Sequence, residues 1–249
     1  MSDELVISYE DARTISFHQA SVNIDACFLL AYIDSDDSRG DKVAEILDQW
    51  SDDGIEHIGI SNHVVGEVIH NIFKNRIRQV LSLAYKKYKS SRTKRPYTFN
   101  KEEESIIGDY RTADYMRSIV PERALENLIS RNELSYSIEI LLKEYKSRYP
   151  TYTEHLTQYY SDSTLKFNET INGLRNDLGI PIIFPYSDES VMWEAFESTS
   201  TEQLGIYDAF HMAISRHHNF DYFATLDGDF VSNYLNIARV TDTKIIKVA

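Results

Sequence analysis

Apolar and polar positions follow two different periods along the first part of the chain. Residues 22–33 are almost all apolar, which predicts a short buried strand ending near Asp25 and a helix after it. Residues 42–50 carry apolar side chains at the i, i+3, i+4, i+7 spacing of an amphipathic helix. A second strand is expected over 55–60, again followed by a helical pattern. Strands that alternate with helices in this way predict a parallel sheet.

This alternation stops after residue 75 and returns about a hundred residues later. Between the two regions, helical patterns follow one another without a convincing strand, and strands are expected again in IPIIF, DYFATL and KIIKV. We therefore expect a Rossmann-like α/β/α sandwich with a central parallel sheet, interrupted by an all-helical insertion. The expected ranges are 19–75 and 178–249 for the α/β domain, 76–177 for the insertion and 1–18 for an N-terminal extension.

Composition is that of an ordinary folded protein. The chain has 249 residues, 42% hydrophobic and 26% charged, with 9 Gly and 5 Pro, so it is long enough for one sizeable core with an insertion. The N-terminal segment MSDELVISYEDARTIS carries acids where a signal peptide carries bases, and no stretch approaches the roughly 18 apolar residues of a membrane span. We expect a cytoplasmic protein that does not enter a membrane. The single cysteine, Cys27, excludes an internal disulfide.

Net charge and local charge point in opposite directions. The formal charge of -13 disfavours a simple nucleic-acid binder, because affinity for nucleic acid comes largely from neutralising phosphates. One segment, however, combines basic residues with tyrosines and contains no Asp or Glu, a mixture that suits phosphate contacts and base stacking. Its candidate RNA-binding residues are Lys74, Arg76, Arg78, Lys86, Lys87, Lys89, Arg92, Lys94 and Arg95. A solvated helix face explains the same run, and both interpretations stay open.

Acidic residues follow the predicted strands. Asp25 comes after the first strand, Asp227 follows DYFATL, and Asp208 lies where a helix begins after a loop. Ligands bind at the carboxyl edge of open parallel sheets, so these side chains are expected to meet there. Carboxylates held close together repel one another unless a cation neutralises them. A hard divalent cation, Mg²⁺ or Mn²⁺, suits such oxygen ligands.

Four segments together resemble the acidic motifs of the PIN-domain nucleases, in the order in which that family has them. The segments are VNIDACFLLAYID, ISNHVVGEVIHNI, IYDAFHMAIS and FATLDGDF. The resemblance implies a PIN-like fold and a metal-dependent endoribonuclease that hydrolyses RNA phosphodiester bonds. Many members of the family are toxins of toxin-antitoxin pairs, so an antitoxin, another protein partner or a homodimer is implied as well.

The resemblance also assigns roles to individual residues. It implies that the catalytic and metal-binding acids are Asp25, Glu67, Asp208 and Asp227. Ser61 and Thr225 match positions where the family often keeps a small hydroxyl residue, which would hydrogen-bond a carboxylate or a metal-bound water. Asp229 would assist the site or cap a turn. The long helical insertion departs from compact PIN nucleases and leaves the substrate open.

Each acid also has a purely structural interpretation. Asp208 is a candidate helix N-cap, and Asp227 precedes a glycine in a turn-like sequence. Glu67 lies far from the apolar arc of its predicted helix, where a solvated side chain is expected. The histidines have no HExxH or other recognised zinc spacing.

Two other functions compete with a nuclease. One is a PIN-fold scaffold that binds RNA or a protein without cutting. The other is a phosphatase of the haloacid dehalogenase type, which also begins with an Asp after the first strand. That type needs a second Asp two positions later, and Cys27 stands there.

Overall fold

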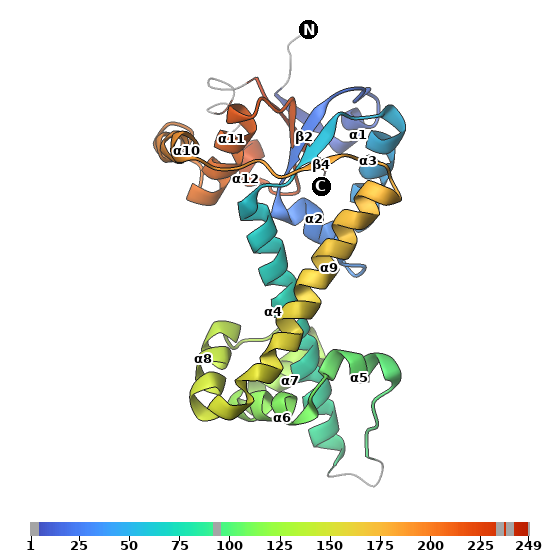
Figure 1. The fold of residues 1–249 in the computed structure, drawn as a ribbon, viewed down its shortest axis with the longest axis vertical. Coiled ribbons are helices and arrows are strands. Elements are labelled where there is room, and N and C mark those ends of the chain that lie inside the picture. The colour runs from blue at the N-terminus through green and yellow to red at the C-terminus, as the bar shows by residue number, and fades with distance from the viewer. Residues whose placement is uncertain (1–4, 92–95, 233–236, 238–241, 249) are drawn as a thin grey trace. The chain divides into compact units, whose positions relative to one another are not determined.

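The chain folds into two compact units. The computed structural model describes residues 5–91, 96–232, 237 and 242–248. The first unit comprises Met1–Val68 and Asn168–Ala249, and the second comprises Ile69–Phe167 (Figure 1). Three of the candidate RNA-binding residues, Arg92, Lys94 and Arg95, lie outside the described residues.

A six-stranded parallel sheet organises the first unit. Its strands are β1 (Val6–Ser8), β2 (Ser21–Ile24), β3 (His57–Gly59), β4 (Ile182–Ile183), β5 (Tyr222–Thr225) and β6 (Lys244–Lys247). They lie in the order β1-β6-β5-β2-β3-β4, and each neighbouring pair is parallel. The predicted α/β class with a parallel sheet is therefore confirmed.

The chain runs outward from β2 through β3 to β4 and then returns to β5 on the other side of β2. The crevice between β2 and β5 is thus where a ligand site is expected.

Helices lie on both faces of this sheet. They are α1 (Tyr9–Ala12), α2 (Ala26–Ile33), α3 (Gly40–Asp53), α10 (Glu189–Thr201), α11 (Ile206–His217) and α12 (Asp229–Ser232). Successive strand residues point to opposite faces. On β5, Phe223 stacks with His211 of α11, while Tyr222 contacts Phe17, which in turn contacts Trp50 of α3. Accordingly, Figure 1 shows α10 and α11 on one side of the strands and α1 and α3 on the other.

The N-terminal residues differ from the expected extension. Val6–Ser8 pair with Ile245–Lys247 of β6, so β1 is an edge strand of the same sheet. A strand of three residues is too short to show the alternation of apolar and polar side chains by which a strand is predicted. The boundaries between the units also differ by several residues from those expected. They fall inside α4 (Asn62–Ser90) and α9 (Leu156–Asn176), where no turn marks a boundary in the sequence.

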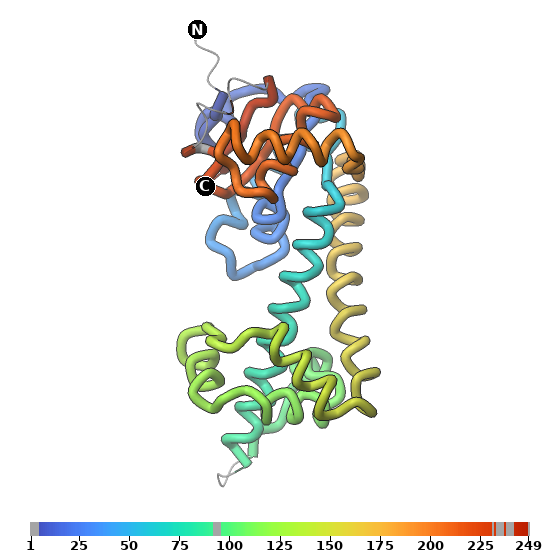
Figure 2. Tube along the Cα trace, turned by 90° about the vertical axis from the view of Figure 1, so that its left-hand side faces the viewer, coloured from blue at the N-terminus to red at the C-terminus, as the bar shows by residue number. Residues whose placement is uncertain are grey.

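The described residues of the second unit form helices and the loops between them, without a strand. Besides parts of α4 and α9, it contains α5 (Lys101–Ile107), α6 (Tyr110–Ile119), α7 (Glu122–Arg131), α8 (Ile138–Arg148) and the 3-10 helix η1 (Pro150–His155). Figure 2 shows the green helices gathered around the later turns of α4. Ile77, Leu81, Leu141 and Tyr145 belong to their shared core. None of the helices in the described residues is long and apolar enough to cross a membrane.

Candidate metal centre

Asp25 directly follows β2, at the point of the strand order where β2 lies beside β5. It caps the N-terminus of α2, because its side chain accepts a hydrogen bond from the Phe28 N–H at 2.7 Å. Ile24 is paired with Ala224, so Asp25 and Thr225 follow side by side on neighbouring strands. The Thr225 hydroxyl donates to the other Asp25 carboxylate oxygen at 2.5 Å. The predicted contact between Thr225 and a carboxylate is present.

The Asp25 carboxylate is buried, at 4% exposed, and other acids act on it. Burial raises the pKa of Asp25 to about 7, against the lowering effect of the hydrogen bonds from Thr225 and Phe28. The charges of Asp227 and Glu67 raise this pKa further. Asp25 is therefore a carboxylate whose negative charge is disfavoured unless a positive charge balances it.

Asp227 follows β5 and shapes its own turn. The Asp227 N–H donates to Thr225 Oγ1 at 2.8 Å, and the Asp227 carboxylate accepts from the Asp229 N–H at 2.9 Å. The structural interpretation of Asp227 as a turn residue is thus correct. Its charge nevertheless acts on the neighbouring acids, because it raises the pKa of both Asp25 and Asp208.

Asp208 is not the N-cap of its helix. The N-cap of α11 is Gly205, and Asp208 is the third helical residue. A Cβ atom on Gly205 would lie 3.2 Å from Asp208 Oδ2, so the glycine leaves space for this carboxylate. Partial burial raises the pKa of Asp208 to about 6, and the charges of Asp227, Asp229 and Glu67 contribute to this rise.

Glu67 is exposed on α4, as its place outside the apolar arc indicated. Its charge still raises the pKa of both Asp25 and Asp208. The four acids, which come from four separate segments, therefore share one electrostatic environment. Ser61 directly precedes α4, and its buried hydroxyl oxygen accepts from the Val64 N–H at 3.4 Å. Its contact with a carboxylate or a metal-bound water stays a prediction.

These carboxylates do not form a ready-made cage for an ion. Among the described residues, no group of three or more Asp, Glu, His or Cys side chains is placed to hold a metal. The donor set nevertheless fits a hard cation, since it consists of carboxylate oxygens and their mutual repulsion would be relieved by positive charge. Mg²⁺ is often held by only one or two carboxylates, with water and substrate phosphate as further ligands. The site suits that mode of binding.

Two cations that the sequence pattern does not single out act on the acids. Lys247 is paired with Thr225 in the sheet and donates to the Leu226 carbonyl. Burial lowers the pKa of Lys247, while the charges of Asp227 and Asp25 oppose this effect. Arg39 is held by two hydrogen bonds to Asp37, and Asp25 contributes to its raised pKa. Only the strand order, which sequence does not reveal, places Lys247 in line with Thr225.

The basic run is partly neutralised within the second unit. Of its six described residues, three form ion pairs with acids of that unit and a fourth lies over two of its aromatic rings. These contacts are Lys74 with Glu139 (3.0 Å), Arg76 with Asp162 (2.6 Å), Lys89 with Glu122 and Glu126 (3.1 Å each), and Lys87 with the ring centres of Phe99 and Tyr110 (4.4 and 4.6 Å). Arg78 donates to the neutral Asn75 side chain. RNA binding by this run therefore stays a prediction. Lys86, whose charge helps to lower the pKa of Glu103, and Arg78, whose partner is neutral, are its candidate residues.

Comparison with known proteins adds no relative. No family model, no curated protein and no solved structure matches the chain. Any functional assignment therefore depends on the residues and their arrangement.

Proposed function

We propose that this chain is a Mg²⁺- or Mn²⁺-dependent endoribonuclease with a PIN-like α/β/α sandwich. One observation carries the proposal. Asp25 is buried at the switch point of a parallel sheet, and the charges of Asp227 and Glu67 add to the rise of its pKa. Asp208 is affected by the same two neighbours. A group of acids that repel one another at such a position is the arrangement a catalytic cation requires.

In this proposal Asp25 and Asp208 are the principal ligands, with Glu67 and Asp227 completing the set through water or directly. A bound divalent cation would supply a water of lowered pKa and stabilise charge on the phosphate oxygens. The Thr225 hydroxyl fixes the orientation of the Asp25 carboxylate. No nucleophilic side chain is needed. Cys27 is unsuited to that role, since burial and the nearby carboxylates raise its pKa to about 12 and keep the thiol neutral.

A biological role as a toxin-type ribonuclease is a further part of the proposal. Such an enzyme would act in the cytoplasm and be restrained by an antitoxin or by another copy of the chain. The overall acidic charge would favour a basic partner segment.

The second candidate is a scaffold that binds RNA or a protein without cutting it. Two observations favour it. The described residues contain no preformed metal group, and much of the basic run is paired internally. Metal binding separates the two functions, because a scaffold need not be stabilised by Mn²⁺.

The decisive experiment is cleavage of a pool of transfer, ribosomal and messenger RNA in Mg²⁺, in Mn²⁺ and in chelator. We expect discrete products only with metal, and none from Asp25→Asn or Asp208→Asn. Glu169→Gln is the matched control, because Glu169 is an exposed acid on α9 outside the group. Intact RNA in all reactions, together with measurable RNA binding, would favour the scaffold. Cleavage that persists in both Asp variants would refute the proposed site.

A further inference from the structure

The last residue of β6 brings a cation to the edge of the sheet where the acids lie. Lys247 is paired with Thr225 of β5, at the carboxyl end of both strands. Side chains in register on neighbouring strands leave the same face of a sheet. The Lys247 side chain therefore starts from the same row and the same face as the Thr225 hydroxyl, which contacts Asp25.

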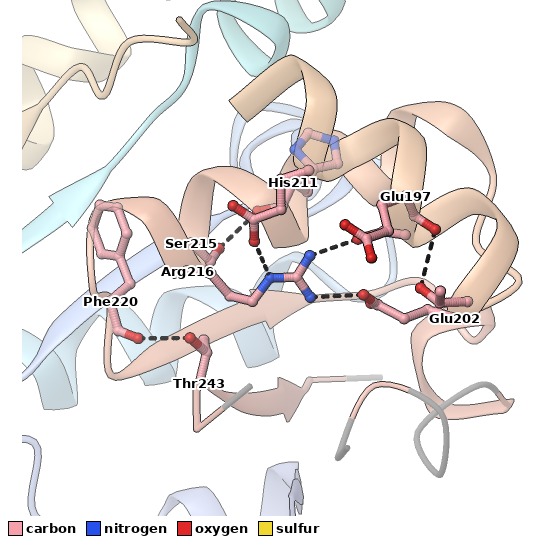
Figure 3. Close-up of polar contacts among 10 residues, drawn as sticks. Glu197, Glu202, His211, Ser215, Arg216, Phe220 and Thr243 are labelled. Carbon is pink, nitrogen blue, oxygen red and sulfur yellow. Dashed lines mark hydrogen bonds and ion pairs between the residues drawn. The ribbon is translucent and has the colours of Figure 1, made fainter. Parts of the chain in front are cut away.

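Hydrogen bonds at both ends of β6 hold this register. Before its start, the Thr243 hydroxyl donates to the Phe220 carbonyl at 3.0 Å, as Figure 3 shows. Beyond its end, the Val248 N–H donates to the Thr225 carbonyl at 3.1 Å. The backbone therefore fixes the starting position of the Lys247 side chain before any ligand binds. A preformed arrangement lowers the ordering cost of binding.

The ammonium group of Lys247 is held beside Asp227 without forming an ion pair with it. It donates to the carbonyl of Leu226, the residue directly before Asp227, and in the described part of the chain no carboxylate pairs with it. Burial lowers the pKa of Lys247, and the charges of Asp227 and then Asp25 oppose this effect. An ammonium has three donors, so the contact with the carbonyl leaves two for a ligand.

Arg39, the other cation that acts on Asp25, already has a carboxylate partner. Its guanidinium donates to both Asp37 carboxylate oxygens, at 2.9 and 2.6 Å. These hydrogen bonds lower the pKa of Asp37 to about 2, so Asp37 stays ionised and balances the charge of Arg39. Of the two cations, Lys247 is therefore the one whose charge is available to a substrate.

Phosphate chemistry gives such a charge a use. When water attacks a phosphodiester, negative charge develops on the phosphate oxygens, and in sites with two metal ions the second ion helps to stabilise it. A lysine ammonium is a compact point charge that binds phosphate oxygens. Asp227 completes the proposed set of ligands, and Lys247 already supplies positive charge beside it. The same charge repels a second metal ion from that position.

We propose that Lys247 takes the place of a second metal ion: its ammonium donates to a non-bridging oxygen of the scissile phosphate, so that cleavage needs one divalent cation per chain. This inference rests on the proposed function and specifies how its site stabilises the phosphate. Lys247 keeps its proton throughout, and water remains the nucleophile.

Metal binding provides a test that does not depend on cleavage. Lys247→Met removes the charge and keeps an unbranched side chain. Lys244→Met is the matched control, because Lys244 begins β6 and is paired with Tyr222 at the other end of the sheet. Calorimetric titration of the metal-free protein with Mn²⁺ at pH 8 should show severalfold tighter binding to Lys247→Met, since a repelling charge is gone. Affinity should be unchanged in Lys244→Met. Weaker Mn²⁺ binding by Lys247→Met would assign the lysine a structural role and overturn the inference.

The rate of RNA cleavage against Mn²⁺ concentration tests the number of ions. We expect the wild-type rate to rise with the first power of the Mn²⁺ concentration before it saturates. Lys247→Met should have a kcat at least about 100-fold lower, the usual effect of removing one donor to the developing charge. Lys247→Arg, which keeps the charge, should retain the first-power dependence. Thermal unfolding would verify that the variants fold.

Three results would contradict the proposal. A second-power dependence in the wild-type chain would overturn this inference alone, because cleavage itself would be established. An unchanged kcat in Lys247→Met would also overturn it alone. No cleavage by the wild-type chain at any Mn²⁺ or Mg²⁺ concentration would overturn the proposed function and this inference with it.

Discussion

Thr225 Oγ1 lies 2.5 Å from a carboxylate oxygen of Asp25, although the two residues are 200 positions apart in the chain. The contact exists because β2 and β5 are neighbours, with Ile24 opposite Ala224. The same Thr225 oxygen accepts from the Asp227 N–H. One hydroxyl group therefore connects two of the four acids.

Replacing this hydroxyl should change how Asp25 titrates. A hydrogen bond to the charged carboxylate lowers its pKa, so Thr225→Val should raise the pKa of Asp25 above its value of about 7. The acid limb of the pH profile for RNA cleavage should then move to higher pH. Cleavage near pH 7 should depend less strongly on the Mn²⁺ concentration. We expect a stability loss of about 1–3 kcal/mol from the unpaired groups. Thr225→Ser keeps the hydroxyl and should preserve the profile; an unshifted profile in the Val variant would contradict this role.

The metal-free protein should become less stable as pH rises through the acidic range. The pKa values of Asp25 and Asp208, about 7 and about 6, exceed the 3.8 of an unperturbed Asp. Between about pH 4 and 7 the folded chain thus holds more protons than the unfolded chain, and stability falls as these groups ionise. The Tm in chelator should be higher at pH 5 than at pH 8, and Asp25→Asn should reduce this difference.

Divalent metal should act most strongly where the acids are ionised. Because Mn²⁺ competes with protons for the carboxylates, it should raise Tm more at pH 8 than at pH 5. Differential scanning calorimetry at both pH values measures this. A Tm that is independent of Mn²⁺ at pH 8 would argue for the scaffold.

The contact between Arg216 and Glu202 should contribute strongly to stability. Glu202 is 1% exposed, and its Oε2 has no hydrogen-bond partner in the described structure. Arg216→Met would leave this carboxylate buried without its cation, at a cost of about 3–5 kcal/mol. Urea denaturation should show the loss, and Arg216→Met/Glu202→Leu should recover part of it. Equal stability of the single and double variants would mean that the buried charge is not the cause.

The basic run should divide into structural and RNA-contacting residues. Arg76→Met should destabilise the protein, because it breaks the 2.6 Å contact with Asp162. Lys86→Gln and Arg78→Gln should instead lower RNA affinity and make it less sensitive to salt. Denaturation midpoints and binding at two salt concentrations distinguish these effects. Unchanged affinity and salt dependence in both Gln variants would assign the run to a solvated helix face.

Local sequence was sufficient to find the elements that carry the acids. The apolar run before Asp25 predicted β2, and the segment DYFATL predicted β5. Hydrophobic periodicity reports which side of an element is buried, and that follows from neighbours in the chain. The exposed position of Glu67 was predicted for the same reason.

Local sequence was less reliable where the interruption of a helix depends on backbone conformation or on a contact with a residue far away in the chain. The helical pattern of residues 101–119 by itself predicts one helix, but the structure has two, α5 and α6, separated at Gly108, which has a φ of +57°. The carbonyl just before this break, that of Ile107, accepts from the Tyr159 hydroxyl at 2.7 Å. Nothing in the local pattern indicated that contact.

The sequence by itself thus determined the α/β class, the five strands from β2 to β6, and the acids that follow β2 and β5. Only the tertiary structure decided that β1 joins the sheet beside β6, that Thr225 reaches Asp25, and that Lys247 stands in line with them. It also decided that basic residues such as Arg76 have acidic partners in their own unit. The physical reason is that strand order and ion pairs depend on residues far apart in the chain, which periodicity does not relate to one another.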